Sequence, residues 1–166
     1  MKIFYAQGET PPSPFRVGNK AYNLARLRQL PYRPFQIPEF LCISTDVCRE
    51  YLEQTGVAHI DAKEAAQKIE ARKIGEEFMK PIYEAAQKLN QPLIARSSGI
   101  AEDSEDNTAA GVFESYKVQG EGKDFLEQAL RKCYSSLFSG RALAFRKKSD
   151  EPVMGVLLQE YKKAET

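Results

Sequence analysis

The chain has 166 residues, of which 42% are hydrophobic and 28% are charged. This length suits one domain with a hydrophobic core, and this composition excludes an intrinsically disordered protein. The net charge of +1 argues against a basic surface for nucleic acid or for an anionic membrane, so any recognition of an anion has to be local.

The cysteines and the apolar runs bear on the compartment of the protein. Its three cysteines are odd in number and lack paired CxxC spacing, which argues against a disulfide framework and against a structural zinc site. We expect Cys42 and Cys133, which fall on apolar faces, to be buried free thiols. No signal peptide and no apolar run of membrane-spanning length is visible, which predicts a cytoplasmic protein without a membrane partner.

The first half of the chain is predicted to contain short strands and amphipathic helices. A small strand over 3–5 precedes a proline-rich irregular segment. Apolar residues at helical spacing then predict a helix over 20–30, which Pro31 ends; they are Ala21, Leu24, Ala25 and Leu27. A buried strand over 40–43 is followed by a helix with Thr45 as its N-cap. The pattern from 61 to 89 is helical, with a break near Gly75 or Pro81.

The second half is predicted to return to strands. Strands over 93–95 and 112–118 flank an acidic loop, a helix covers 125–137, and a second helix runs through Arg141 and Arg146. The final strand is expected over 153–159. This mixed order predicts an α+β fold with an antiparallel or mixed sheet.

Gly18-Asn19-Lys20 stands at the start of the first predicted helix. A helix N-terminus offers unpaired N–H groups, and a lysine there adds a mobile charge that suits phosphate. The segment is therefore an anion site in outline, although a glycine before a helix with a lysine in its first turn is also common without function. Its spacing does not match a P-loop.

Arg96 is expected at the C-terminal end of the strand over 93–95. Arginine is rarely buried without a partner, and its planar fork fits phosphate oxygens in a bidentate way. Residue types alone leave two readings open. Arg96 binds a ligand anion, or it forms a salt bridge with a nearby carboxylate of Glu102, Asp103, Glu105 or Asp106.

Thr108-Ala109-Ala110-Gly111 lies between two predicted strands. Small side chains there let the backbone approach a ligand closely, but a plain hairpin turn explains them equally well. The acidic residues before this segment could hold Mg²⁺, although such loops are more often only solvated. The single histidine, His59, has no nucleophile-and-base constellation that would indicate a hydrolase.

Five blocks of sequence, taken together and in order, resemble one family. GNKAYNLARL, IPEFLCISTDVCREYLEQTG, LIARSSGIAEDSEDNTAAGVFESYKVQG, LRKCYSSLFSGRALAFRKK and VMGVLLQEY are similar to successive segments of the N-terminal ATP-binding domain of phosphoenolpyruvate synthase, pyruvate phosphate dikinase and related dikinases. The blocks span nearly the whole chain.

The resemblance implies an ATP-grasp fold, of which this chain is the N-terminal lobe. It implies that Lys20 and Arg96 contact the triphosphate of ATP, and that a loop with Thr108, Ala109 and Gly111 closes over the phosphates through its backbone N–H groups. A hinge of Gln159, Glu160 and Tyr161 would hydrogen-bond adenine through backbone atoms, with Leu157 and Leu158 as apolar neighbours. The family uses ATP to phosphorylate a histidine on a separate domain and releases AMP.

The departures from the family pattern limit what this chain would do by itself. Asn19 and Ala21 replace two glycines of the family's phosphate turn, and Gly99 replaces an alanine. We expect residues 1–166 to form a single domain, with the second lobe, its Mg²⁺ ligands and the phosphohistidine domain supplied in cis or in trans. The alternative is a non-catalytic module that binds nucleotide weakly or serves only in interactions.

Overall fold

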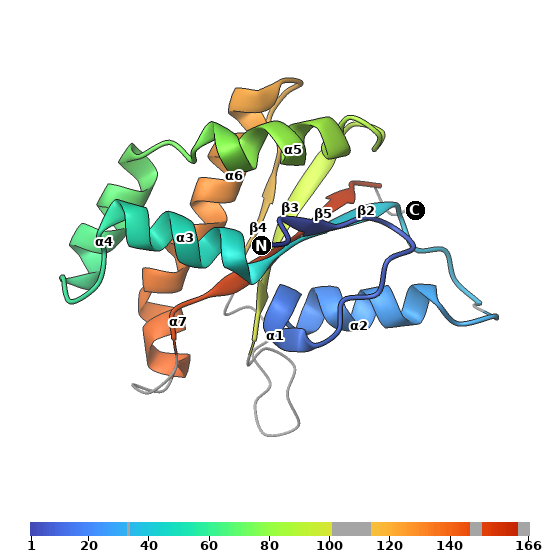
Figure 1. Ribbon diagram of the computed structural model, residues 1–166, viewed down its shortest axis with the longest axis horizontal. Coiled ribbons are helices and arrows are strands. Elements are labelled where there is room, and N and C mark those ends of the chain that lie inside the picture. Colours follow the sequence, from blue (N-terminus) through green and yellow to red (C-terminus); the bar gives the residue numbers. More distant parts are fainter. Residues whose placement is uncertain (33, 101–113, 147–150, 163–166) are drawn as a thin grey trace.

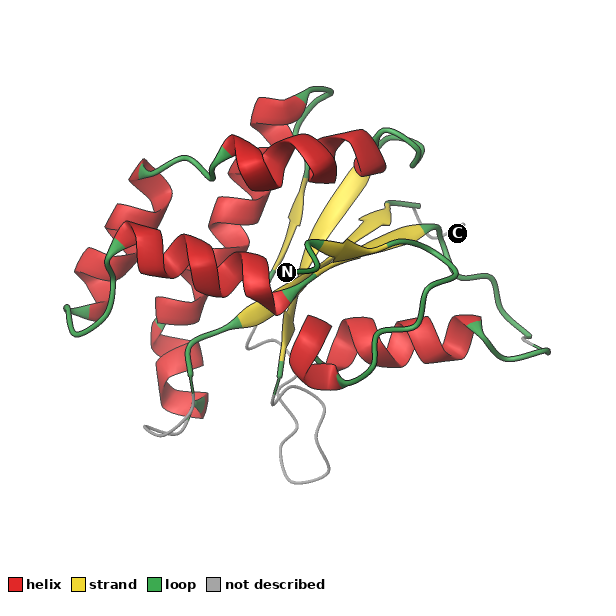
Figure 2. Cartoon of the chain, viewed as in Figure 1, coloured by secondary structure: helices red, strands yellow, loops and turns green. Residues whose placement is uncertain are grey.

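One antiparallel sheet runs through the middle of the molecule (Figures 1 and 2). The computed structural model describes residues 1–32, 34–100, 114–146 and 151–162. The strands lie in the order β1-β2-β5-β3-β4, and every neighbouring pair is antiparallel. The strands are β1 (Phe4–Tyr5), β2 (Phe40–Ile43), β5 (Met154–Glu160), β3 (Leu93–Gly99) and β4 (Ser115–Lys117). The predicted α+β class is confirmed. Of the two expected kinds of sheet, antiparallel or mixed, the structure has the antiparallel one.

Helices cover both faces of this sheet (Figure 1). On one face lie α1 (Pro14–Val17) and α2 (Asn19–Arg28). The other face carries the larger group: α3 (Thr45–Thr55), α4 (Ala62–Ala71), α5 (Glu76–Ala86) and α6 (Lys123–Ser135). A 3-10 turn, η1 (Ser136–Phe138), and α7 (Gly140–Phe145) continue from the end of α6.

Each face of the sheet has its own hydrophobic core. The larger core lies under α3 to α6 and includes Leu158, while the smaller core lies under α1 and α2 and includes Leu157. Successive side chains of a strand point to opposite faces, so these neighbouring leucines belong to different cores. In α2, Ala21 and Ala25 are buried against the sheet, whereas Leu27 is 38% exposed.

The prediction that Arg96 ends a strand is wrong. β3 continues to Gly99, and its pairing with β5 runs from Leu93 opposite Glu160 to Gly99 opposite Met154. The run Ser97-Ser98-Gly99 resembles a turn in sequence. It is drawn into the sheet because β5 offers a full row of backbone partners beside it.

The end of one helix also differs from the prediction. Ser44, and not Thr45, is the N-cap of α3, because Ser44 keeps an extended backbone and Thr45 is already the first residue of the helix; the Thr45 hydroxyl donates to the Phe15 carbonyl at 2.7 Å. The break expected near Gly75 or Pro81 is found at the first of these, since α4 ends at Ala71 and Gly75 is the N-cap of α5, while Pro81 lies inside α5. Across the described ranges, no helix has the length and apolar character needed to cross a membrane.

All three cysteines are buried free thiols, as predicted for Cys42 and Cys133. Loss of solvation by burial raises the pKa of the Cys42, Cys48 and Cys133 thiols to about 12. A thiol becomes a nucleophile or a metal ligand only after losing its proton. The cysteines therefore serve the packing of the two cores.

Candidate functional site

The N-terminus of α2 is pressed against strand β3. Gly18, the N-cap of α2, has a φ of 82°, and a Cβ atom there would lie 1.9 Å from the carbonyl oxygen of Ser98. The backbone N–H of Ala21 donates to the Ser98 hydroxyl at 3.0 Å, and the side-chain amide of Asn19 donates to the Ile100 carbonyl. Only glycine allows this approach.

A second glycine allows α1 to lie equally close to the sheet. Gly155 in β5 stands opposite Ser98 in the register, and a Cβ atom there would lie 2.1 Å from the Val17 carbonyl oxygen. The turn between α1 and α2 therefore packs directly against the backbones of β3 and β5. This contact fixes the position of Lys20 in the first turn of α2.

Lys20 and Arg96 meet at the same part of β3. The Lys20 ammonium group donates to the carbonyl of Ser97 at 2.9 Å, the residue that follows Arg96. Arg96 stands opposite Leu157 in the register, and Leu157 packs under α2. Paired residues of neighbouring strands point to the same face, so Arg96 projects on the face of the sheet that carries α2.

Arg96 is held by a neutral side chain. One of its terminal nitrogens donates to the side-chain oxygen of Gln159 at 3.2 Å, and the Gln159 amide nitrogen donates to the Pro38 carbonyl at 3.2 Å. Within residues 1–32, 34–100, 114–146 and 151–162, no carboxylate forms an ion pair with Arg96. The predicted alternative partners at 102–106 lie outside the described residues.

The residues of the expected hinge divide between the two faces. Leu158 is fully buried under α6 and its neighbours, on the face away from Arg96. The Glu160 carboxylate accepts from the Asn90 N–H at 2.8 Å. The backbone N–H groups of Glu160 and Tyr161 donate to the carbonyls of Glu39 and Pro92 at 2.9 and 2.8 Å. These two N–H groups are thus already engaged within the protein.

Tyr161 also has a cation beside its ring. The ammonium group of Lys117, on the edge strand β4, lies 4.3 Å from the ring centroid of Tyr161. Lys117 stands opposite Ile94 in the register, and Ile94 stands opposite Gln159. A row of side chains therefore crosses the sheet from Gln159 to Lys117, next to the row that contains Arg96.

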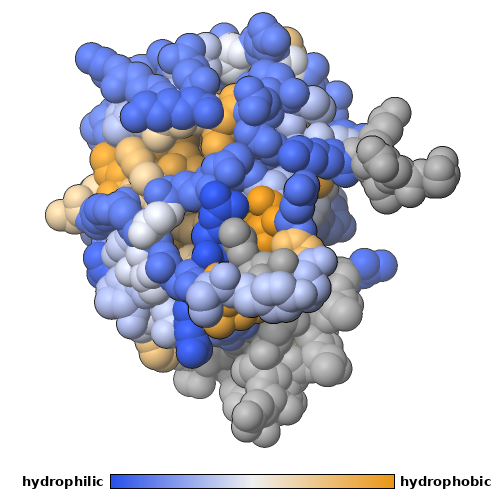
Figure 3. All heavy atoms as spheres, turned by 90° about the vertical axis from the view of Figure 1, so that its right-hand side faces the viewer, coloured by the Kyte–Doolittle hydropathy of each residue, from blue (hydrophilic) through white to orange (hydrophobic). Residues whose placement is uncertain are grey.

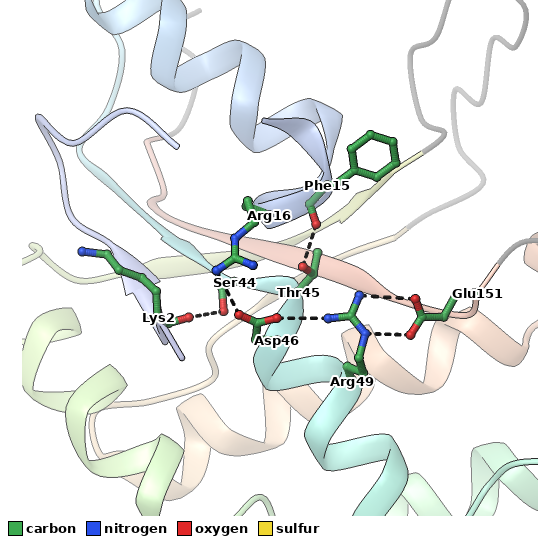
Figure 4. A network of polar contacts seen from close by, with 8 residues as sticks. All are labelled: Lys2, Phe15, Arg16, Ser44, Thr45, Asp46, Arg49 and Glu151. Atoms are coloured by element: carbon green, nitrogen blue, oxygen red, sulfur yellow. Dashed lines mark hydrogen bonds and ion pairs between the residues drawn. The ribbon is translucent and has the colours of Figure 1, made fainter. Parts of the chain in front are cut away.

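An ion-pair network fixes α1 to the start of α3 (Figure 4). Arg16 of α1 lies 3.1 Å from Asp46, which also accepts from Arg49 at 3.0 Å. Arg49 reaches Glu151, ahead of β5, with two hydrogen bonds of 2.7 and 3.3 Å. Nearby, the Ser44 hydroxyl donates to the Lys2 carbonyl at 2.6 Å. The network holds the segment that enters Gly18 from its N-terminal side.

The side of the molecule where β5 ends carries exposed apolar residues (Figure 3). In that view hydrophobic areas alternate with hydrophilic ones. Leu30, Tyr32 and Phe35, in the segment after α2, are 49%, 80% and 50% exposed. They line a cavity of about 560 Å³ together with Lys162, just beyond β5.

One part of the predicted site, the loop between the strands, lies outside the described residues. Thr108, Ala109 and Gly111 lie outside the residues that the structure describes. Over the described ranges, no group of three or more histidine, cysteine, aspartate or glutamate side chains is arranged to hold a metal ion. His59 is exposed and has a φ of 64°.

The side chain of Gln159 was missed by sequence reasoning, which gave this residue only a backbone role. A signal for it exists in the chain. Gln159 directly follows the apolar run VMGVLL in a strand that is buried along its whole length, and a buried polar side chain requires a partner.

Comparison with known proteins gives consistent results. Residues 15–164 match the family described as "Pyruvate phosphate dikinase, AMP/ATP-binding domain". The chain is 26% identical over 153 residues to a Bacillus subtilis protein named "Uncharacterized phosphotransferase YvkC", with 86% of this chain aligned. It is 28% identical over 152 residues to the "Rifampicin phosphotransferase" of Bacillus cereus, with 80% aligned. The matched part spans 17% of the length of each relative.

Proposed function

The chain belongs to the family of pyruvate phosphate dikinase AMP/ATP-binding domains, and on this premise we propose that it binds ATP on the sheet face that carries α2. Lys20 and Arg96 contact the triphosphate. Thr108, Ala109 and Gly111 close over it through backbone N–H groups, and adenine lies toward Gln159 to Tyr161.

One observation carries the proposal. Two cations from distant parts of the chain meet on one strand, because the Lys20 ammonium group donates to the carbonyl next to Arg96 at 2.9 Å. The Arg96 guanidinium has a neutral side-chain partner in Gln159. A cation held in this way keeps its charge for an anionic ligand.

The hinge is proposed with one modification. Because the N–H groups of Glu160 and Tyr161 donate within the protein, backbone contacts to adenine come from other atoms of 159–161. Leu158 faces the opposite core, and Leu157 is fully buried under α2, so the apolar contact on the ligand face comes from Ile94.

The wider reaction is a proposal for the assembled protein. This lobe would act in a dikinase-type phosphotransferase, similar to phosphoenolpyruvate synthase, in which ATP yields AMP and a phosphohistidine on another domain. The second lobe and the phosphohistidine domain act in cis or in trans, and the second lobe supplies the Mg²⁺ ligands. The exposed apolar side chains next to Lys162 support contact with further polypeptide at that side.

Isothermal titration of the 166-residue chain with ATP and Mg²⁺ tests the proposal. Arg96→Ala and Lys20→Ala are each expected to weaken binding by ~1.5–3 kcal/mol, or about 10- to 150-fold, because each removes a charge-assisted hydrogen bond. Lys63→Ala, an exposed lysine of α4, is the matched control and should bind as the wild type does.

The variants are also compared by thermal unfolding. If Lys20→Ala and Arg96→Ala unfold, both residues are structural and the proposed phosphate site is wrong. If the wild-type chain shows no binding at millimolar ATP, this lobe does not bind nucleotide by itself, and the non-catalytic interaction module becomes the better description.

A further inference from the structure

The partner of Arg96 is unusual because it is uncharged. Gln159 is only 6% exposed, and both ends of its amide are used: the oxygen accepts from Arg96 and the nitrogen donates to Pro38. Each contact is 3.2 Å long. A buried amide with both ends satisfied is fixed in one orientation.

The Pro38 carbonyl decides that orientation. A carbonyl oxygen only accepts, so it requires the NH₂ end of the Gln159 amide, and the oxygen end must then face the guanidinium. Pro38 lies two residues before β2, and β2 is the neighbour of β5 in the sheet. The direction of the Gln159 dipole is therefore set by the backbone and does not depend on a ligand.

From these contacts we infer that Gln159 is a positioning residue for Arg96: it fixes the direction of the guanidinium without neutralising its charge. The inference rests on the proposed function, since the positioned charge is assigned to the triphosphate of ATP. A carboxylate in place of Gln159 would hold the guanidinium more strongly, but it would compete with phosphate for the charge. The amide leaves the remaining N–H donors of Arg96 and its full charge to the nucleotide.

The first test needs no nucleotide. In the ¹⁵N-labelled 166-residue chain, NMR relaxation of the Arg96 Nε–H group is compared between the wild type and Gln159→Met, which keeps the length of the side chain and removes both hydrogen bonds. We expect a more mobile Arg96 side chain in the variant. An equally ordered Arg96 in both proteins would overturn the positioning role.

The second test separates charge from geometry. Titrations with ATP and with adenosine are run on the wild type, Gln159→Met and Gln159→Glu. Gln159→Met should weaken ATP binding about fivefold, less than the loss of Arg96 itself, because the charge stays and only its direction is freed. Gln159→Glu should weaken it at least as much, although it retains an acceptor. Adenosine binding should not change in either variant, because adenosine has no phosphate for Arg96 to contact.

Two controls make the result specific. Gln87→Glu places the same charge on an exposed site after α5 and should leave ATP binding unchanged. In an Arg96→Ala background, the Gln159 variants should cause no further loss. An equal loss for ATP and adenosine, or a loss that persists without Arg96, would overturn the inference.

The outcomes for folding and for the proposed function stay distinguishable. Circular dichroism checks each variant. If Gln159→Met does not fold, Gln159→Glu carries the test through the titrations, where a loss for ATP alone supports the positioning role and an equal loss for ATP and adenosine overturns it. A wild-type chain that binds no ATP refutes the proposed function, and the NMR comparison still decides whether Gln159 positions Arg96.

Discussion

Gly18 is the residue at which a single methyl group should separate α2 from the sheet. Its φ of 82° and ψ of 161° lie in a region of backbone conformation that is essentially restricted to glycine. In Gly18→Ala the new Cβ would stand 1.9 Å from the Ser98 carbonyl oxygen, where ordinary contacts begin at 3.4 Å. The helix start and β3 must therefore move apart by about 1.5 Å.

The cost of Gly18→Ala has two parts. The backbone strain is about 1–3 kcal/mol, and overpacking of a close contact adds about 1–3 kcal/mol. We therefore expect the free energy of unfolding to fall by ~2–6 kcal/mol. This is a large share of the ~5–15 kcal/mol that stabilises a typical domain. ATP binding should weaken as well, because Lys20 moves with the start of α2.

Gly122→Ala is the matched control for this prediction. Gly122 is also the residue before a helix, with a φ of 124° and a ψ of 159°, but a Cβ atom there would meet nothing within 4 Å. It should lose only the strain, ~1–3 kcal/mol, and keep wild-type ATP affinity. Urea denaturation and ATP titration measure both variants. Equal losses of stability would refute the argument from close approach.

Two further predictions concern the cores. Leu130→Ala in α6, at a residue with no exposed surface, should lower the free energy of unfolding by ~2–5 kcal/mol. Leu143→Ala in α7, where the side chain is 41% exposed, should lower it far less in the same urea titration; similar losses would contradict the assignment of the core. The three thiols should resist a disulfide reagent at pH 8 in the folded chain and react in urea. Burial raises the pKa of these thiols from 9.0 to about 12. The contribution of the buried, protonated thiols to the free energy of unfolding is therefore complete below pH 9. It falls as the pH rises toward 12, since only the unfolded chain releases these protons there; replacing the cysteines with alanine should flatten that fall.

The sequence determined the family, the α+β class and most of the elements. Periodicity located α6 and the strand over 40–43 because local patterns of apolar residues are short-range information. Five ordered blocks pointed to the same family as the match over residues 15–164. Lys20 and Arg96 were predicted as site residues because their chemical types suit phosphate, and that role stays a prediction.

Tertiary contacts decided what surrounds those residues. Arg96 looked like the end of a strand, but β5 supplies backbone partners as far as Gly99 and keeps β3 extended. Gln159 could not be identified as the partner of Arg96, because the two residues are 63 positions apart and meet only through the pairing of β3 with β5. The need for glycine at position 18 likewise comes from the Ser98 backbone. Sequence patterns report which residues share a face of one element, whereas strand register and the docking of α2 decide which faces meet.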